Sequence, residues 1–131
     1  MNAPSPDLRR LSPGLWVTGQ VWPGQAGDLR RAGITCLVNH RPDGEEPGQP
    51  SASEIARAGA EAGLKVVDIP IRGLPDEAAV AATRAVLDAL GPDEAAVFFC
   101  RSGMRSAAAW AMAERREAAA AAGYDLSRLP L

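Results

Sequence analysis

The sequence predicts an α/β fold of three layers, in which a mostly parallel sheet is covered by helices on both faces. Short apolar segments alternate with segments of helical periodicity, an order typical of strand–helix–strand units. Residues 34–40 read ITCLVNH, which is β-branched and almost wholly apolar, as expected of a strand covered on both faces. Because strand–helix–strand connections are right-handed and return to the same sheet edge, these strands should run parallel.

Four strands are expected in this sheet, each a short apolar run bounded by glycine, proline or polar residues, at 15–20, 34–40, 65–70 and 95–100. The last of them reads AAVFFC and ends on a cysteine, Cys100. In folds of this class, functional side chains gather beyond the carboxyl ends of the strands. The end of the last strand is therefore the first place to look for a site.

Helices are expected between and after these strands, at 27–33, 51–64, 75–91 and about 102–122. The second begins with Ser51 and Glu54, a capping box in which each side chain satisfies a free backbone N–H group. Gly63 is suited to ending it, because glycine readily adopts the left-handed conformation found after a helix. Asp76 and Glu77 begin the third, where a carboxylate interacts favourably with the helix dipole.

The length and composition fit a single domain, which we assign to residues 12–131, preceded by a flexible arm at 1–11. A net charge of −2 gives no reason to expect nucleic acid or an anionic membrane as a partner, and no oligomeric state is predicted. The N-terminus has no apolar signal core and no run is long enough to span a bilayer, so a cytoplasmic location is expected.

The segment CRSGMRS, residues 100–106, joins the last strand to the last helix. Its backbone N–H groups can converge on one point, where the helix dipole adds partial positive charge. Such a point suits both a tetrahedral anion and a thiolate, so the pKa of Cys100 should fall and its nucleophilicity should rise. The expected anion-binding residues are Arg101, Ser102, Gly103, Met104 and Arg105.

Particular residue types in this segment strengthen the interpretation. Arg105 offers a planar fork to an oxyanion, Gly103 lets the backbone turn its amides inward, and Ser106 can hydrogen-bond a thiolate or a leaving group. A cysteine at a strand end is more often a small core residue. Here the glycine and the two arginines at fixed offsets favour a catalytic loop, with a small anionic substrate.

The long loop after residue 40, HRPDGEEPGQP, reaches the same carboxyl edge as Cys100. Arg41 can add a second positive group to the site, and Asp43 or Glu45 can act as a general acid. An ordinary turn, with proline, aspartate and glycine in their usual positions, explains the segment equally well. Gln20, at the end of the first strand, is a weaker candidate of the same kind.

Two further residues have plain interpretations. His40 is the only histidine and no cysteine cluster accompanies it, so neither a metal nor another cofactor is expected. Cys36 lies inside an apolar strand and is most simply a core residue. If it came within disulfide reach of Cys100 it could act as a resolving thiol, and the sequence leaves this open.

The segment CRSGMRS resembles the active-site loop that cysteine-dependent phosphatases and rhodaneses share with variations. Residues 12–115 as a whole resemble the phosphatase domain of the beta-lactamase-hydrolase-like family. The resemblance rests on LWVTGQ, VNHRPDGEEPGQPS, VDIPI and CRSGMRS, in that order. It implies a fold like that of dual-specificity phosphatases, with Cys100 as the nucleophile and Arg105 as the anion-binding arginine.

Three features depart from that family pattern. The spacing from Cys100 to Arg105 is Cys-x4-Arg, one residue shorter than is usual in phosphatases and typical of rhodanese loops. The residue before the nucleophile, commonly histidine in phosphatases, is Phe99. The usual acid is an aspartate in the loop after the third strand, where IPIRGLPDE places Gly73. Asp76 is close by, but a helix N-terminal role explains it better.

Two enzymatic hypotheses and one non-enzymatic hypothesis follow. The first is a phosphatase that hydrolyses a phosphate monoester through a phosphorylated Cys100, and the resemblance favours it. The second is a rhodanese-type sulfurtransferase that carries a persulfide on Cys100, which the short spacing and the missing acid favour. The third is a module that binds an anion or a partner without catalysis, which the presence of both Cys100 and Arg105 disfavours. The phosphatase is the leading prediction, and the sequence does not identify its substrate.

Overall fold

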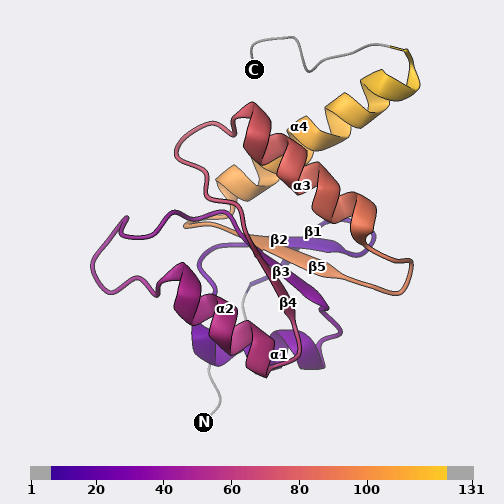
Figure 1. The fold of residues 1–131 in the computed structure, drawn as a ribbon. Helices are drawn as coiled ribbons and strands as arrows, with labels where there is room; N and C mark the ends of the chain where they lie inside the picture. Colours follow the sequence, from indigo (N-terminus) through magenta and orange to yellow (C-terminus); the bar gives the residue numbers. More distant parts are fainter. Residues whose placement is uncertain (1–6, 124–131) are drawn as a thin grey trace.

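The computed structural model describes residues 7–123, and its centre is a five-stranded sheet in the order β1–β2–β5–β3–β4 (Figure 1). The strands are β1 (Arg9–Ser12), β2 (Leu15–Thr18), β3 (Cys36–Asn39), β4 (Lys65–Asp68) and β5 (Ala96–Phe99). β1 pairs antiparallel with β2, and the other three pairings are parallel. The predicted mostly parallel sheet is confirmed.

Helices cover both faces of this sheet. They are α1 (Ala26–Arg31), α2 (Ala52–Glu61), α3 (Glu77–Ala89) and α4 (Met104–Ala121), with a short 3-10 helix, η1 (Pro23–Gln25), before α1. Figure 1 shows α1 and α2 on one face and α3 and α4 on the other. Two buried clusters match this division, since one contains Ala79 of α3 and Ala109 of α4, and the other contains Leu29 of α1 and Ile55 of α2. The three-layer α/β prediction is therefore confirmed.

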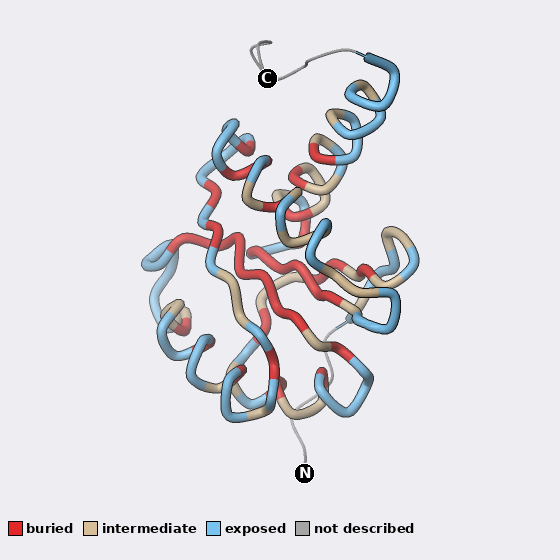
Figure 2. The backbone as a smooth tube through the Cα atoms, turned by 45° about the vertical axis from the view of Figure 1, so that its right-hand side comes forward, coloured by how far each residue is buried: buried red, intermediate tan, exposed pale blue. Residues whose placement is uncertain are grey.

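Two of the three inner strands, β3 and β5, have nearly continuous apolar sequences. Every residue of β3 and β5 is buried, because alternate side chains enter the clusters on opposite faces. Figure 2 shows this buried backbone running through the middle of the molecule. β4 lies at one edge of the sheet, and its first and last residues, Lys65 and Asp68, are exposed. β5, which leads into the cysteine loop, is thus held on both sides by neighbouring strands.

The N-terminal boundary differs from the prediction. Residues 9–11 were assigned to a flexible arm, but they belong to β1, which forms a hairpin with β2 through Pro13 and Gly14. Leu11 of this strand packs against the core. Residues 1–6 of the expected arm and 124–131 of the expected domain lie outside the described residues. Within 7–123, no helix is long and apolar enough to cross a membrane.

Candidate active site

The loop from Cys100 to Gly103 lies at the carboxyl edge of the sheet, between β5 and the start of α4. The Gly103 N–H donates to the Cys100 sulfur at 3.1 Å. Gly103 has φ 94°, a left-handed conformation that favours glycine. A Cβ atom there would also lie 3.3 Å from the backbone of Thr18 in β2. Glycine therefore serves both the turn and the close packing of the loop on β2.

The Cys100 sulfur is the point on which the loop amides converge. Burial raises the pKa of Cys100, but hydrogen bonds from the backbone N–H groups of Ser106, Ser102, Gly103 and Arg105 outweigh it, and the pKa lies below its ordinary value. The sequence indicated the hydroxyl of Ser106, but the Ser106 backbone N–H reaches the sulfur and the hydroxyl lies 2.8 Å from His40 Nδ1. The Met104 N–H turns to the Ser102 hydroxyl at 3.3 Å. The loop N–H groups therefore surround the Cys100 sulfur and stabilise its ionised form.

Cys36 contrasts with Cys100 in both position and environment. It begins β3, where burial raises the pKa of its thiol. In the sheet register Cys36 pairs with Ala96, and Cys100 lies four residues further along the chain. Four residues of extended chain span about 13 Å, whereas a disulfide requires Cα atoms within about 7 Å. This placement excludes Cys36 as a resolving thiol for Cys100.

Iodoacetamide should alkylate Cys100 much faster than Cys36 at pH 6. Both thiols are buried, so the difference rests on ionisation: the loop amides lower the pKa of Cys100, whereas burial raises the pKa of Cys36. Peptide mass spectrometry after timed quenching measures the two rates separately in the same sample. Equal labelling of the two thiols across pH 5 to 8 would contradict the lowered pKa of Cys100.

Arg105 lies across the loop and is held from two sides. Its NH1 group donates to Glu45 Oε2 and to the Ile71 carbonyl, and its NH2 group donates to Glu45 Oε1, each at 2.8 Å. The hydrogen bonds to Glu45 raise the pKa of Arg105, and the nearby Cys100 contributes in the same direction. A guanidinium has five N–H groups, so two remain on Arg105 beyond these three bonds, and the side chain also hydrogen-bonds the Cys100 sulfur.

Arg41 does not serve as an exposed anion-binding group as expected. Its side chain is only 2% exposed and lies beneath the long loop after β3. Its Nε donates to Glu45 Oε1, its NH1 to Gln20 Oε1 and its NH2 to Glu46 Oε1, each at 2.9 Å. Arg41 therefore anchors this loop and helps to hold Glu45 against Arg105.

The three carboxylates considered as general acids all have other partners. Asp43 accepts from the Ala52 N–H at 2.7 Å, at the start of α2. Asp76 accepts from the Ala79 N–H at 2.8 Å as the N-cap of α3, which is the structural role that the sequence favoured. Hydrogen bonding to Arg105 lowers the pKa of Glu45 to about 2, so Glu45 has no proton to donate at neutral pH.

Asp68, at the end of β4, was not singled out from the sequence. Asp68 is exposed, but partial desolvation of its carboxyl raises its pKa, and the nearby Asp43 charge adds to the effect. Its register partner in β3 is Asn39, and Asn39 in turn pairs with Phe99 of β5. Asp68 is thus two strands away from the cysteine loop, roughly 10 Å at the usual strand spacing. This distance is too long for direct contact with the Cys100 sulfur.

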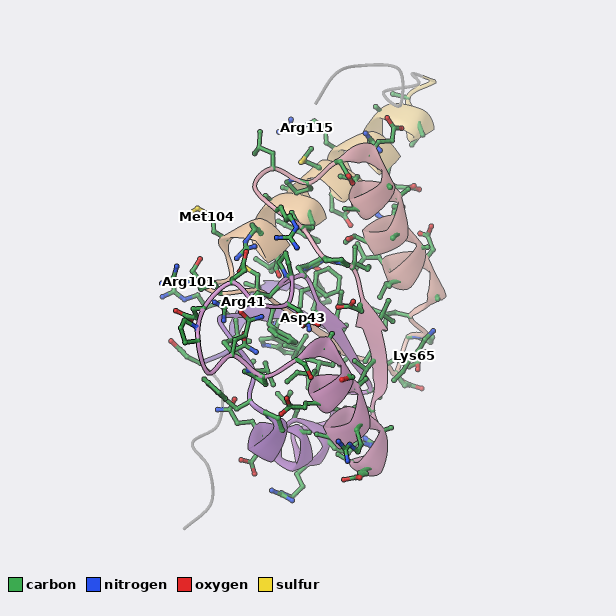
Figure 3. All side chains as sticks on the ribbon, turned by 60° about the vertical axis from the view of Figure 1, so that its left-hand side comes forward. Arg41, Asp43, Lys65, Arg101, Met104 and Arg115 are labelled. Carbon is green, nitrogen blue, oxygen red and sulfur yellow. The ribbon has the colours of Figure 1, made fainter. Side chains whose placement is uncertain are left out.

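The exposed rim of the loop is formed by Arg101 and Met104. Figure 3 shows both side chains projecting outward from the same side of the molecule. Met104 is 77% exposed, and the Arg101 guanidinium lies 3.6 Å from a Glu46 carboxylate oxygen. Arg101 therefore remains solvated beside the loop, where it can attract an anion but does not form part of the buried site.

Behind the loop, His40 lies between the hydroxyl groups of Ser106 and Thr83, an arrangement that was not predicted from the sequence. His40 is fully buried, with Nδ1 2.8 Å from the Ser106 hydroxyl and Nε2 3.1 Å from the Thr83 hydroxyl. Burial lowers the pKa of His40 to about 4, and the Arg105 charge adds to the shift, so the ring is neutral at pH 7. Among residues 7–123, no three His, Cys, Asp or Glu side chains form a potential metal site.

Known proteins resemble this chain in sequence. Residues 7–116 match the family described as beta-lactamase hydrolase-like protein, phosphatase-like domain. The chain is 31% identical over 106 residues to the beta-lactamase hydrolase-like protein of Agrobacterium fabrum, covering 80% of this chain and 24% of that protein. A Xylella fastidiosa protein of the same description is 32% identical over 125 residues, which cover 87% of this chain and 28% of that protein. The chain thus spans about a quarter of the length of these relatives.

Solved structures share the fold. A candidate phosphatase from Shewanella putrefaciens superposes with a TM-score of 0.74 at 21% identity, covering 87% of this chain and 71% of that one. A candidate phosphatase from Neisseria meningitidis gives 0.70 at 23% identity and covers 89% of both chains. TpbA of P. aeruginosa, in complex with pTyr, gives 0.53 at 18% identity, covering 74% of this chain and 54% of TpbA. With a sequence match over most of its length, the chain belongs to the family of the phosphatase-like domain of beta-lactamase hydrolase-like proteins.

Proposed function

We propose that this chain is a cysteine-dependent phosphatase that hydrolyses phosphate monoesters through a phosphorylated Cys100. The observation that carries the proposal is the Cys100 sulfur, which accepts from the Gly103 N–H at 3.1 Å and faces further loop N–H groups beside the Arg105 guanidinium. Membership of a phosphatase-like family supports the same chemistry. The match covers only 24% of the length of that relative, so the proposal concerns this domain alone.

In the first step, the Cys100 thiolate attacks phosphorus and forms an S–P bond. The ester P–O bond breaks, and its electron pair leaves on the alcohol oxygen. The phosphoryl oxygens are then stabilised by the loop amides and by the two remaining N–H groups of Arg105. Glu45 fixes the opposite edge of that guanidinium, so the free N–H groups are oriented before substrate arrives.

In the second step, water attacks the phosphorus of the phosphorylated cysteine. The S–P bond breaks and returns its electron pair to sulfur, which regenerates the thiolate and releases inorganic phosphate. The lowered pKa of Cys100 favours both steps, because it increases the fraction of thiolate and makes the thiolate a better leaving group. Neither step consumes a cofactor.

The leaving group should decide which esters react well. Asp43 and Asp76 cap helices, and Glu45 is ionised, so none of these three carboxylates is placed to protonate a departing oxygen. An aryl oxide is stable enough to leave without a proton, whereas an alkoxide is not. We therefore propose aryl phosphates as the substrate class. The pTyr in the TpbA complex is an ester of this kind.

Side-by-side assays with p-nitrophenyl phosphate, glycerol phosphate, and thiosulfate plus cyanide test this function. The aryl phosphate should turn over at least about tenfold faster than the alkyl phosphate, since general acid catalysis is worth about 100-fold or more where it operates. Thiocyanate formation should not exceed that of a blank. Thiocyanate that requires Cys100, without phosphate release from either ester, would establish the sulfurtransferase instead. Anion binding without either reaction would indicate a non-catalytic module.

A further inference from the structure

We propose that His40 is a positioning residue of this site, which holds Ser106 and thereby orients the backbone N–H groups that bind the Cys100 sulfur. The inference rests on the proposed role of Cys100 as a nucleophile. It assigns a function to a histidine that lies 60 residues from the cysteine in the sequence. His40 itself has no contact with the substrate in this proposal and acts only through Ser106.

The position of His40 brings it directly behind the cysteine loop. It follows β3, and its backbone N–H donates to the Phe99 carbonyl at 2.8 Å, so it is paired with the residue that precedes Cys100. Its Nδ1 lies 2.8 Å from the hydroxyl of Ser106 in the first turn of α4. The Ser106 backbone N–H is one of the groups that hydrogen-bond the Cys100 sulfur. Two hydrogen bonds therefore connect the imidazole to the thiolate.

The surroundings of the ring restrict it to this orientation. The Nε2 atom lies 3.1 Å from the Thr83 hydroxyl of α3, and the ring packs edge-on against Phe98 with centroids 5.3 Å apart. Hydroxyl groups donate or accept, so both ring nitrogens of the neutral imidazole are satisfied. Rotation of the ring would bury a nitrogen without a partner, which is unfavourable in a site with no solvent access. His40 thus connects α3, β3 and α4 rigidly behind the loop.

The residue immediately before Cys100 is a buried phenylalanine, Phe99, whose side chain has no hydrogen-bonding group. His40 brings an imidazole to the same strand end from the neighbouring strand β3. The first turn of α4 is fixed by a side-chain bond across the sheet edge, and its N–H groups stay directed at the sulfur.

The decisive experiment is the pH profile of Cys100 alkylation by iodoacetamide in the full chain, read from the Cys100 peptide. His40→Leu should move the profile upward by about one pH unit, the effect of weakening one hydrogen bond to a thiolate. Ser106→Ala should produce a similar shift. The double variant should shift the profile no further than the larger single change, because both act on the same connection. His40→Asn, which keeps a polar amide near the position of Nδ1 that can donate to or accept from the Ser106 hydroxyl, should restore most of the wild-type profile.

Thr83→Val is the matched control, because it removes the other bond of the same ring and leaves the His40–Ser106 pair in place. It should lower thermal stability while moving the Cys100 profile by less than half as much as His40→Leu. An equal shift in Thr83→Val, additive shifts in the double variant, or an unchanged profile in Ser106→Ala would overturn the proposal. If His40→Leu does not fold, Ser106→Ala and His40→Asn decide the question. Alkylation requires no turnover, so failure of the phosphatase proposal would be seen separately.

Discussion

Cys100→Ser should reduce the hydrolysis of p-nitrophenyl phosphate by about 10⁵-fold or more, the loss seen when an enzyme loses its nucleophile. The loop amides lower the pKa of the Cys100 thiol. The pKa of a serine hydroxyl is far higher than that of a thiol, so the same amides cannot supply an alkoxide. Single-turnover release of p-nitrophenolate measures the loss, and the burst of one equivalent per site should disappear with it.

Cys36→Ala provides the control for this change. Cys36 lies in β3 with a buried thiol of raised pKa, far from the loop, so its replacement should leave the rate constant close to that of the wild type. The Cys100→Ser protein should still bind inorganic phosphate, because its N–H groups and Arg105 are unchanged. Hydrolysis by Cys100→Ser within tenfold of the wild-type rate would show that Cys100 is not the nucleophile.

Arg105→Ala should lower kcat for the aryl phosphate by about 10³-fold, the usual loss when a charged donor to a transferring phosphoryl group is removed. The structure gives Arg105 two N–H groups beyond those that Glu45 and Ile71 occupy. Arg105→Lys should recover little of this loss, because lysine keeps the charge but not the planar fork that these contacts orient. Steady-state kinetics of both variants measure the effect.

Arg101→Ala is the matched control in the same loop. The Arg101 side chain is 66% exposed and contacts Glu46 only at 3.6 Å. Exposed ion pairs of this kind contribute little, so a change of less than about tenfold, mainly in KM, is expected. Similar losses of kcat in Arg101→Ala and Arg105→Ala would mean that the loop acts only through its overall positive charge, and the assigned role of Arg105 would be wrong.

The sequence by itself determined the framework of this protein. Apolar runs and helix-capping residues act between neighbours in the sequence. The folded structure keeps the elements that they predict, because the core buries the same apolar positions. The capping box of Ser51 and Glu54 forms at the start of α2 as predicted. Gly63 adopts φ 89° just after that helix. The cysteine loop was predictable for the same reason, since its position between a buried strand and a helix is a local property.

Only the tertiary structure decided how the polar side chains pair. Arg41 was expected at the rim, yet it is buried among partners from two loops, because its charge is stabilised by Glu45 and Glu46 rather than by solvent. Glu45 meets Arg105 across 60 residues of chain, and His40 meets Ser106 across 66. Such pairs depend on which strand ends the sheet order brings together. The spacing of these residues in the sequence does not show which of them meet in the folded chain. The pairs form because burying a charged or polar group without a partner is unfavourable.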